Sequence, residues 1–204
     1  MRDNKLHDFV KFVLLAAIIL IMFLVPFLGY IPLGFMKATL IHIPVIVGSI
    51  VLGAKYGGLL GFLFGLTSLI ANTVTNPSVT SFVFSPFYSV GGVGGNGWSL
   101  VICFVPRILV GIVPHYVYKA FRNKHQTVAL AVSGVAGSLT NTLLVMNFIY
   151  LFFGEAYAEA TGRAIDGLYK AIMTIIVMNG VPEAIVASII TVAICKALLK
   201  LEKK

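Results

Sequence analysis

Arg107 is the residue whose position in this sequence most constrains what the protein does. It lies in the apolar stretch 98–119 (WSLVICFVPRILVGIVPHYVYK), which is long enough to cross a bilayer. On a helix, its separation of roughly nine residues from Trp98 places the cation on the order of 13 Å deep in the membrane. An arginine at that depth costs at least about 2.5 kcal/mol, so it must face a protein interior or a water-filled cavity.

Pro106 directly precedes Arg107 and cannot donate a backbone hydrogen bond to the carbonyl of Ile102. At membrane depth, a carbonyl released in this way is tolerated where it is buried in protein or lines a cavity. A cation beside an interrupted helical hydrogen bond indicates the wall of a site for an anionic or polar solute. The alternative is an ion pair that stabilises the helices and binds no ligand.

Further polar side chains fall in the outer half or near the middle of other apolar stretches. They are Asn72, Asn141, Asn147, Asn179 and Glu183. Polar groups are expensive in lipid unless they converge, so we predict that they share one chamber with Arg107. Asn141 and Asn147 are about 240° apart on a helix, so we favour Asn141 as the inward residue. Pro182 precedes Glu183 and repeats the arrangement of Pro106 and Arg107.

The elements that must position these residues are membrane-spanning helices. Of the 204 residues, 59% are hydrophobic and 11% are charged, and the mean hydropathy is +1.00. We therefore predict an all-α integral membrane protein whose residues 1–204 form a single membrane domain. Six apolar stretches are predicted to span the bilayer: 8–27, 38–52, 56–73, 98–120, 127–153 and 168–199.

Lysine and arginine are distributed unequally between the two sides of this predicted bundle. One side has only Lys37, Arg163 and Lys170, and the other carries both termini and most of the remaining basic residues. Because basic residues concentrate in cytoplasmic segments, both termini are expected to be cytoplasmic. The net charge of +8 is then explained by topology and does not indicate nucleic-acid binding.

The long segment 75–97 (TNPSVTSFVFSPFYSVGGVGGNG) separates the third and fourth predicted spans on the outer side. Loops of this length in compact proteins are usually functional lids or disordered. Its aromatic middle, including Phe84 and Tyr88, favours a segment that folds back over a cavity. Its glycine-rich end is typical of a hinge.

Small residues mark two helix faces. Gly57, Gly61 and Gly65 recur every four residues, which predicts close backbone packing against a neighbouring helix. Ala16 and Ala17 give the otherwise bulky first span a spot where a foreign helix could approach. An ordinary lipid-facing helix is the alternative for that span.

Catalytic signatures are absent from the sequence. It contains no HExxH, GxSxG, paired Glu-Glu, Walker A or CxxC pattern. We therefore expect neither an enzyme nor a bound metal or cofactor. If the protein moves its solute by ATP hydrolysis, a partner must supply the ATPase.

The stretch HIPVIVGSIVLGAKYGGLLGFLFGLTS, which begins at His42, resembles the second-to-third helix signature of the substrate-capture (S) components of energy-coupling-factor (ECF) vitamin transporters. NPSVTSFVFSPFYS and CFVPRILVGIVPHYVYK most resemble the pantothenate-specific branch. The resemblance implies a multi-pass protein of a bacterial cell membrane that captures a vitamin from outside. It also implies docking on a transmembrane scaffold (T component) that carries two cytoplasmic ATPases. The family's first helix often shows Ala-x-x-x-Ala, which is only half present here at Ala16 and Ala17.

Pantothenate suits the site expected from the residues. Arg107 could hold its carboxylate through a bidentate contact, and Asn141, Asn179 and Glu183 could serve its hydroxyls and amide. Phe84 and Tyr88 would close over its dimethyl centre. An ionised Glu183 would repel the ligand, so it is either protonated through burial or paired with Arg107.

The sequence alone leaves three other functions possible. One is an S component for another vitamin, such as folate. A second is a stand-alone secondary transporter with Glu183 as the proton-coupling group, and a third is a structural membrane subunit that binds nothing.

Overall fold

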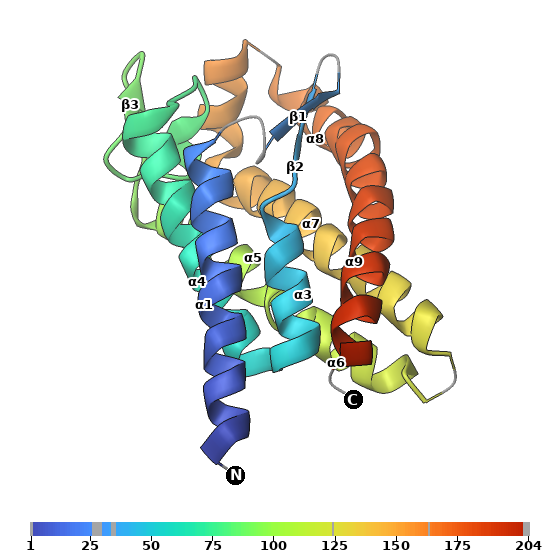
Figure 1. Ribbon diagram of the computed structural model, residues 1–204. Coiled ribbons are helices and arrows are strands. Elements are labelled where there is room, and N and C mark those ends of the chain that lie inside the picture. Colours follow the sequence, from blue (N-terminus) through green and yellow to red (C-terminus); the bar gives the residue numbers. More distant parts are fainter. Residues whose placement is uncertain (1, 26–29, 34–35, 124, 163, 202–204) are drawn as a thin grey trace.

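The protein is a bundle of long helices that lie side by side, as the ribbon of the computed structural model shows (Figure 1). The structure describes residues 2–25, 30–33, 36–123, 125–162 and 164–201. The first helix begins and the last helix ends at the same end of the bundle (Figure 1). The elements in chain order are α1 (Arg2–Leu24), β1 (Tyr30–Leu33), β2 (Met36–Thr39), α3 (His42–Leu52), α4 (Ala54–Ile70), η1 (Ala71–Thr75), η2 (Ser81–Val83), β3 (Ser89–Val90), β4 (Val93–Gly94), α5 (Gly97–Val110), α6 (Val113–Phe121), α7 (Gln126–Thr161), α8 (Ile165–Ile175), η3 (Ile176–Gly180) and α9 (Val181–Leu201).

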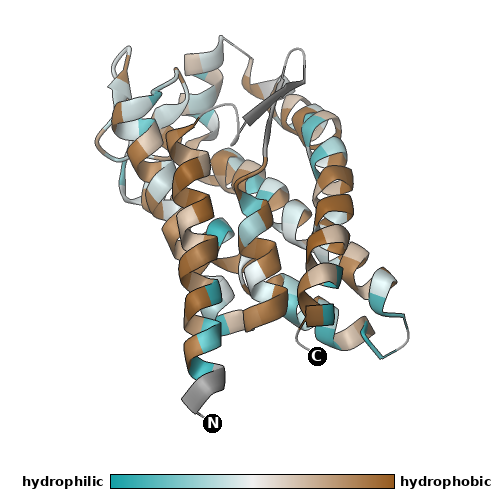
Figure 2. Cartoon of the chain, viewed as in Figure 1, coloured by the Kyte–Doolittle hydropathy of each residue, from teal (hydrophilic) through white to brown (hydrophobic). Residues whose placement is uncertain are grey.

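Helices dominate the described residues, in agreement with the predicted all-α membrane class. Hydrophobic turns cover most of α1 and α9, and hydrophilic residues gather where α1 begins and α9 ends (Figure 2). Five segments are long and apolar enough to cross a membrane: Lys5–Leu24, Ala54–Thr75, Gly97–Phe121, Gln126–Thr161 and Gly167–Leu201. Each overlaps one of the six predicted spans.

The predicted second span is shorter in the structure. Residues 38 and 39 belong to β2, which pairs antiparallel with β1, and the helix α3 begins only at His42. Pro44 explains the late start, because proline is tolerated in the first turn of a helix but not in its interior. With 11 residues, α3 rises about 16 Å.

Other boundaries also differ from the sequence prediction. The first helix runs from Arg2 to Leu24 and not from 8 to 27, of which residues 26 and 27 lie outside the described part of the chain. Helix α7 continues past the predicted end at 153, through a kink at Phe153 (φ −135°, ψ 18°), to Thr161. The last predicted span is divided into α8, η3 and α9.

Helix α3 lies at the centre of the bundle. Every residue from His42 to Ile50 is buried, because α1, α4, α6, α7 and α9 all pack against it. Its apolar residues form one core cluster with Ile19, Leu60 and Leu130. A second cluster, built around Phe82, Ile102 and Val145, lies where the segment 75–97 meets α5 and α7.

The predicted glycine stripe is confirmed as a packing seam between α4 and α5. A Cβ atom on Gly61 would overlap the carbonyl oxygen of Arg107, and one on Gly57 would overlap the carbonyl oxygen of Gly111. At Gly65 an added Cβ would lie 2.6 Å from the ring of Phe104. Glycine is thus required for the close approach that sets where the backbone of Arg107 lies.

Candidate functional site

Arg107 lies inside helix α5, and its side chain is 7% exposed. Its Nη1 donates a 2.8 Å hydrogen bond to the carbonyl oxygen of Ile102. That carbonyl is the group that Pro106 leaves without a backbone donor, and α5 continues through Pro106 without a break. The guanidinium therefore satisfies the carbonyl that Pro106 leaves without a donor in its own helix.

Two aromatic rings flank the guanidinium. The Cζ atom of Arg107 lies 5.1 Å from the ring centroid of Phe84 and 5.6 Å from that of Phe64. Both distances are within the range of cation–π attraction. From the sequence, Phe84 was expected to cover the dimethyl centre of the vitamin, whereas Phe64 was not named. Phe64 is three residues after Gly61 on the face of α4 that packs on α5, so the glycine stripe was the signal that could have identified it.

The segment 75–97 folds back onto the helices, as its aromatic middle predicted. Phe82 is fully buried, and its ring meets that of Phe153 edge-on at 5.8 Å. Ser99 Oγ donates a 2.7 Å hydrogen bond to the Phe82 carbonyl. Tyr88 and Phe84 pack against the same cluster, whereas Phe87 points away and is 78% exposed.

Asn72 ties this segment to α4. It lies in η1, a π-helical turn, where its Nδ2 donates to the Ser68 carbonyl at 2.8 Å. Its Oδ1 accepts a 2.9 Å hydrogen bond from Ser81 Oγ. Both ends of the amide are thus engaged within the protein, which gives Asn72 an evident role in positioning the segment that carries Phe84.

Asn141 and Asn179 both present a buried acceptor. Within the described part of the chain, neither Oδ1 has a hydrogen-bond partner. Asn179 lies in η3, and η3 packs on α7 one residue from Asn141: a Cβ on Gly180 would lie 3.1 Å from Thr142 Cγ2. An unsatisfied buried acceptor costs about 1–3 kcal/mol, so this region favours a ligand that donates hydrogen bonds.

Ser138 is a further residue of this region that the sequence analysis missed. It is 1% exposed on α7, three residues before Asn141, and its Oγ has no hydrogen-bond partner among the described residues. The sequence could have identified Ser138, because its hydroxyl lies one helical turn before Asn141, the asparagine that we favoured as the inward residue.

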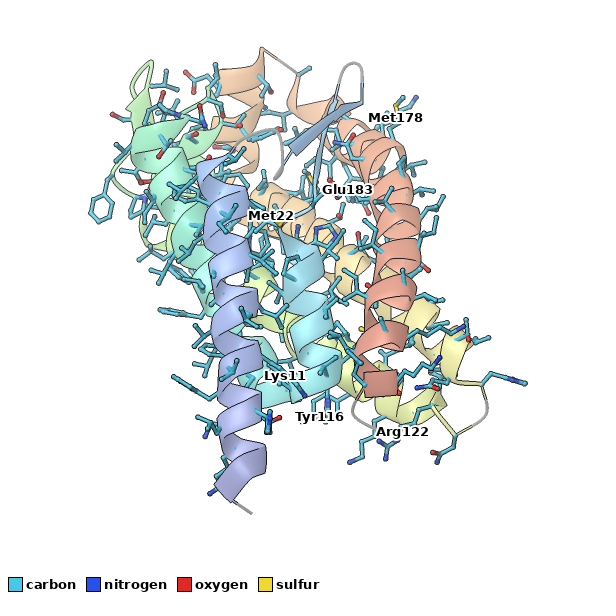
Figure 3. The ribbon with its side chains drawn as sticks, viewed as in Figure 1. Lys11, Met22, Tyr116, Arg122, Met178 and Glu183 are labelled. Carbon is cyan, nitrogen blue, oxygen red and sulfur yellow. The ribbon has the colours of Figure 1, made fainter. Side chains whose placement is uncertain are left out.

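Glu183 is buried in the first turn of α9, at 7% exposure. In Figure 3 it points into the bundle, whereas Met178, which is 55% exposed, lies on the outside. The turn before it, η3, is π-helical, and such turns occur frequently at functional sites. Pro182 and Glu183 therefore lie directly after a turn whose backbone departs from the regular α-helix.

The remaining predicted residues lie elsewhere. The Asn147 amide donates to the Leu143 carbonyl of its own helix at 2.7 Å. Ala16 packs against the chain's own core, and Ala17 is exposed on α1. Among the described residues, no group of three His, Cys, Asp or Glu side chains could hold a metal ion.

Taken together, the arrangement offers a buried, ring-flanked cation at α5 and unsatisfied amide acceptors at α7 and η3. A small anion that also carries hydroxyl or amide donors would need groups of these two kinds. The arrangement offers recognition and no evident reaction chemistry.

The chain is similar to known transport proteins over nearly its whole length. Residues 7–195 match the family described as "ECF transporter, substrate-specific component". The chain is 43% identical to the pantothenic acid transporter PanT of Lactococcus lactis subsp. cremoris, over 80% of this chain and 79% of the relative. It is 30% identical to the pantothenate transporter PanT of Leuconostoc mesenteroides subsp. mesenteroides, over 100% of this chain and 98% of the relative. These proteins are transporters and not enzymes, as the sequence led us to expect. The chain belongs to the ECF family of substrate-specific transporter components and is a multi-pass membrane protein.

Proposed function

We propose that this protein captures pantothenate from outside a bacterial cell and carries it across the cell membrane as an ECF S component. The observation that carries the proposal is the buried cation Arg107 in a chain 43% identical to a protein named a pantothenic acid transporter. A permanent charge is retained inside a membrane protein where an anionic ligand needs it.

The donors and acceptors of pantothenate complement the site. Its carboxylate would pair with the guanidinium of Arg107. Its two hydroxyls and its amide N–H would donate to Oδ1 of Asn141 and of Asn179. Glu183 would accept from a hydroxyl or, when protonated, donate to the ligand. Phe84 and Tyr88 would cover the dimethyl centre from the segment 75–97.

Transport also needs partners and a defined orientation. We propose that both termini are cytoplasmic, because most lysines and arginines lie at the end of the bundle where α1 begins and α9 ends. A transmembrane T component with two ATPases would supply the energy. Helix α1 exposes apolar residues such as Leu14, Ile18 and Ile21 to such a partner, with Ala17 beside them.

A ligand panel on the purified full-length protein tests the proposal. Trp98 stacks on Phe152 at 4.2 Å beside the segment 75–97, so its fluorescence can report binding. Pantothenate should bind more tightly than panthenol, in which CH₂OH replaces the carboxylate, and more tightly than folate. In Arg107→Ala the preference over panthenol should disappear. Tighter binding of panthenol or folate by the unmodified protein would overturn the proposal.

Reconstitution in liposomes tests the partners. Pantothenate should accumulate only when the T component, the ATPases and ATP are present. Accumulation by this chain alone under a proton gradient, with loss in Glu183→Gln, would instead establish a secondary transporter.

A further inference from the structure

A concave site that does not include Arg107 lies at the end of the bundle where α9 terminates. A pocket of about 260 Å³ is lined by Gln126, Lys196, Leu199 and Lys200. It lies between the beginning of α7 and the last turns of α9. No residue proposed for vitamin binding contributes to it.

The pocket results from the way α7 and α9 pack. The two helices are closest near Gly134, where an added Cβ would lie 2.8 Å from the Cα atom of Ser188. Gln126 is eight residues before Gly134, and Lys196 is eight residues after Ser188. Both are therefore about 12 Å from the close approach on antiparallel helices. Packed helices cross at an angle, so they separate on moving away from their closest point. The bundle thus opens at this end.

The lining is suited to an anion. Lys196 and Lys200 lie one turn apart on the same face of α9, where like charges repel each other. None of the four lining residues is acidic. In the described part of the chain, the side chain of His125 makes no capping hydrogen bond at the start of α7. The positive end of this 36-residue helix therefore adds to the field of the two lysines.

The surroundings of the pocket are those of a membrane surface. Leu199 contributes an apolar wall. Ile185 and Ile189 on α9 are 55% and 64% exposed and lie two to three turns before Lys196 on the same helix face, so apolar surface continues from the charged pocket along α9. A ligand with an anionic head and attached hydrocarbon chains would satisfy both surfaces. Basic pockets between transmembrane helices at a membrane surface bind anionic lipid head groups in this way.

We propose that this pocket binds the head-group phosphate of an anionic phospholipid from the adjacent leaflet. The phosphate lies between Lys196 and Lys200, and Gln126 donates its amide to a phosphate oxygen. The acyl chains run along the exposed apolar residues Ile189 and Ile185 of α9. This site is independent of the vitamin-binding proposal.

Native mass spectrometry of the full chain, released from nanodiscs of equal phosphatidylglycerol and phosphatidylcholine, tests the assignment. The unmodified protein should retain one phosphatidylglycerol in preference to phosphatidylcholine. The double variant Lys196→Gln/Lys200→Gln should retain it about thirtyfold less well, because the phosphate loses both of its cationic hydrogen-bond donors in the pocket. The matched control is Lys5→Gln/Lys55→Gln, which removes two exposed lysines of other helices.

Retention in the control pair should change less than about threefold. Equal losses in the two double variants would show a diffuse surface attraction and would overturn the site. Displacement of the lipid by millimolar inorganic phosphate would likewise reject the lipid assignment in favour of a free anion. Thermal unfolding in detergent, measured on the same samples, shows that each variant is folded.

Discussion

The two proline–charge pairs of this protein start from the same sequence pattern and end in different structures. At Pro106–Arg107 the helix α5 is continuous. The arginine side chain itself donates a hydrogen bond to the Ile102 carbonyl, which receives no backbone hydrogen bond from Pro106. At Pro182–Glu183 the preceding turn is π-helical, and the neighbouring Asn179 keeps a buried acceptor without a partner in the described residues.

This difference follows from what the two charged side chains can do. A guanidinium has five N–H donors, so it can satisfy a free carbonyl and still bind a ligand. An ionised carboxylate has none to give to a backbone carbonyl, so a helix at proline followed by glutamate must adjust its backbone instead. The region of α5 around Arg107 is therefore preorganised. The backbone at η3 is irregular, and the Asn179 acceptor there is available to a ligand that donates hydrogen bonds.

The largest expected effect comes from Arg107→Ala. It removes the proposed carboxylate partner and should weaken pantothenate binding by about a hundredfold or more, because a buried charge pair loses one member. Arg107→Lys should recover only part of the loss, since lysine lacks the planar fork. Titration of Trp98 fluorescence measures both. An unchanged dissociation constant in Arg107→Ala would mean that Arg107 serves the helix alone.

The next effect tests how the α4–α5 seam positions Arg107. Gly61→Val places side-chain atoms against the Arg107 carbonyl and should reduce stability by about 1–3 kcal/mol while weakening binding. Gly58→Val is the control, because a Cβ there lies 3.6 Å from Ile112 Cγ1 in ordinary contact. Thermal unfolding in detergent should separate the two variants. Equal losses of stability and of binding in Gly61→Val and Gly58→Val would show that the packing of α4 on α5 does not position Arg107.

A smaller effect on pantothenate binding is expected from the acceptors at η3. Asn179→Ala removes one of the proposed acceptors and should weaken pantothenate binding by about tenfold, the value of roughly one well-made hydrogen bond. Asn147→Ala is the matched control, since that amide already bonds to its own helix at Leu143. Calorimetric titration of both proteins provides the comparison. Equal losses would contradict the placement of the ligand at η3.

The smallest effect compares the two prolines directly. Pro182→Ala allows the turn to reclose as α-helix, which should shift Asn179 and weaken binding by about threefold. Pro106→Ala supplies a backbone donor for a carbonyl that already has one, so binding should change less. A larger loss at Pro106 than at Pro182 would reverse our view of which side is preorganised.

Much of this arrangement follows from the order of residues alone. The membrane class, the approximate spans and the glycine seam were all predicted, because apolar length and small-residue spacing act over one or two helical turns. The depth of Arg107 and its need for a protein environment follow from the cost of a charge in lipid. The aromatic segment 75–97 was expected to fold back over a cavity, and it packs on α5 and α7.

Other features depended on contacts between distant residues. Three contacts result from side-chain geometry that residue spacing does not specify. They are the hydrogen bond from Arg107 to the Ile102 carbonyl, the Phe64 ring beside the guanidinium and the hydrogen bond from Ser81 to Asn72. The two π-helical turns and the delayed start of α3 depend on which backbone hydrogen bonds survive beside prolines and packed neighbours. Local patterns thus determine what must be buried, because burial is a property of each segment. Only the packed bundle decides which buried polar atoms find partners and which are left for a ligand.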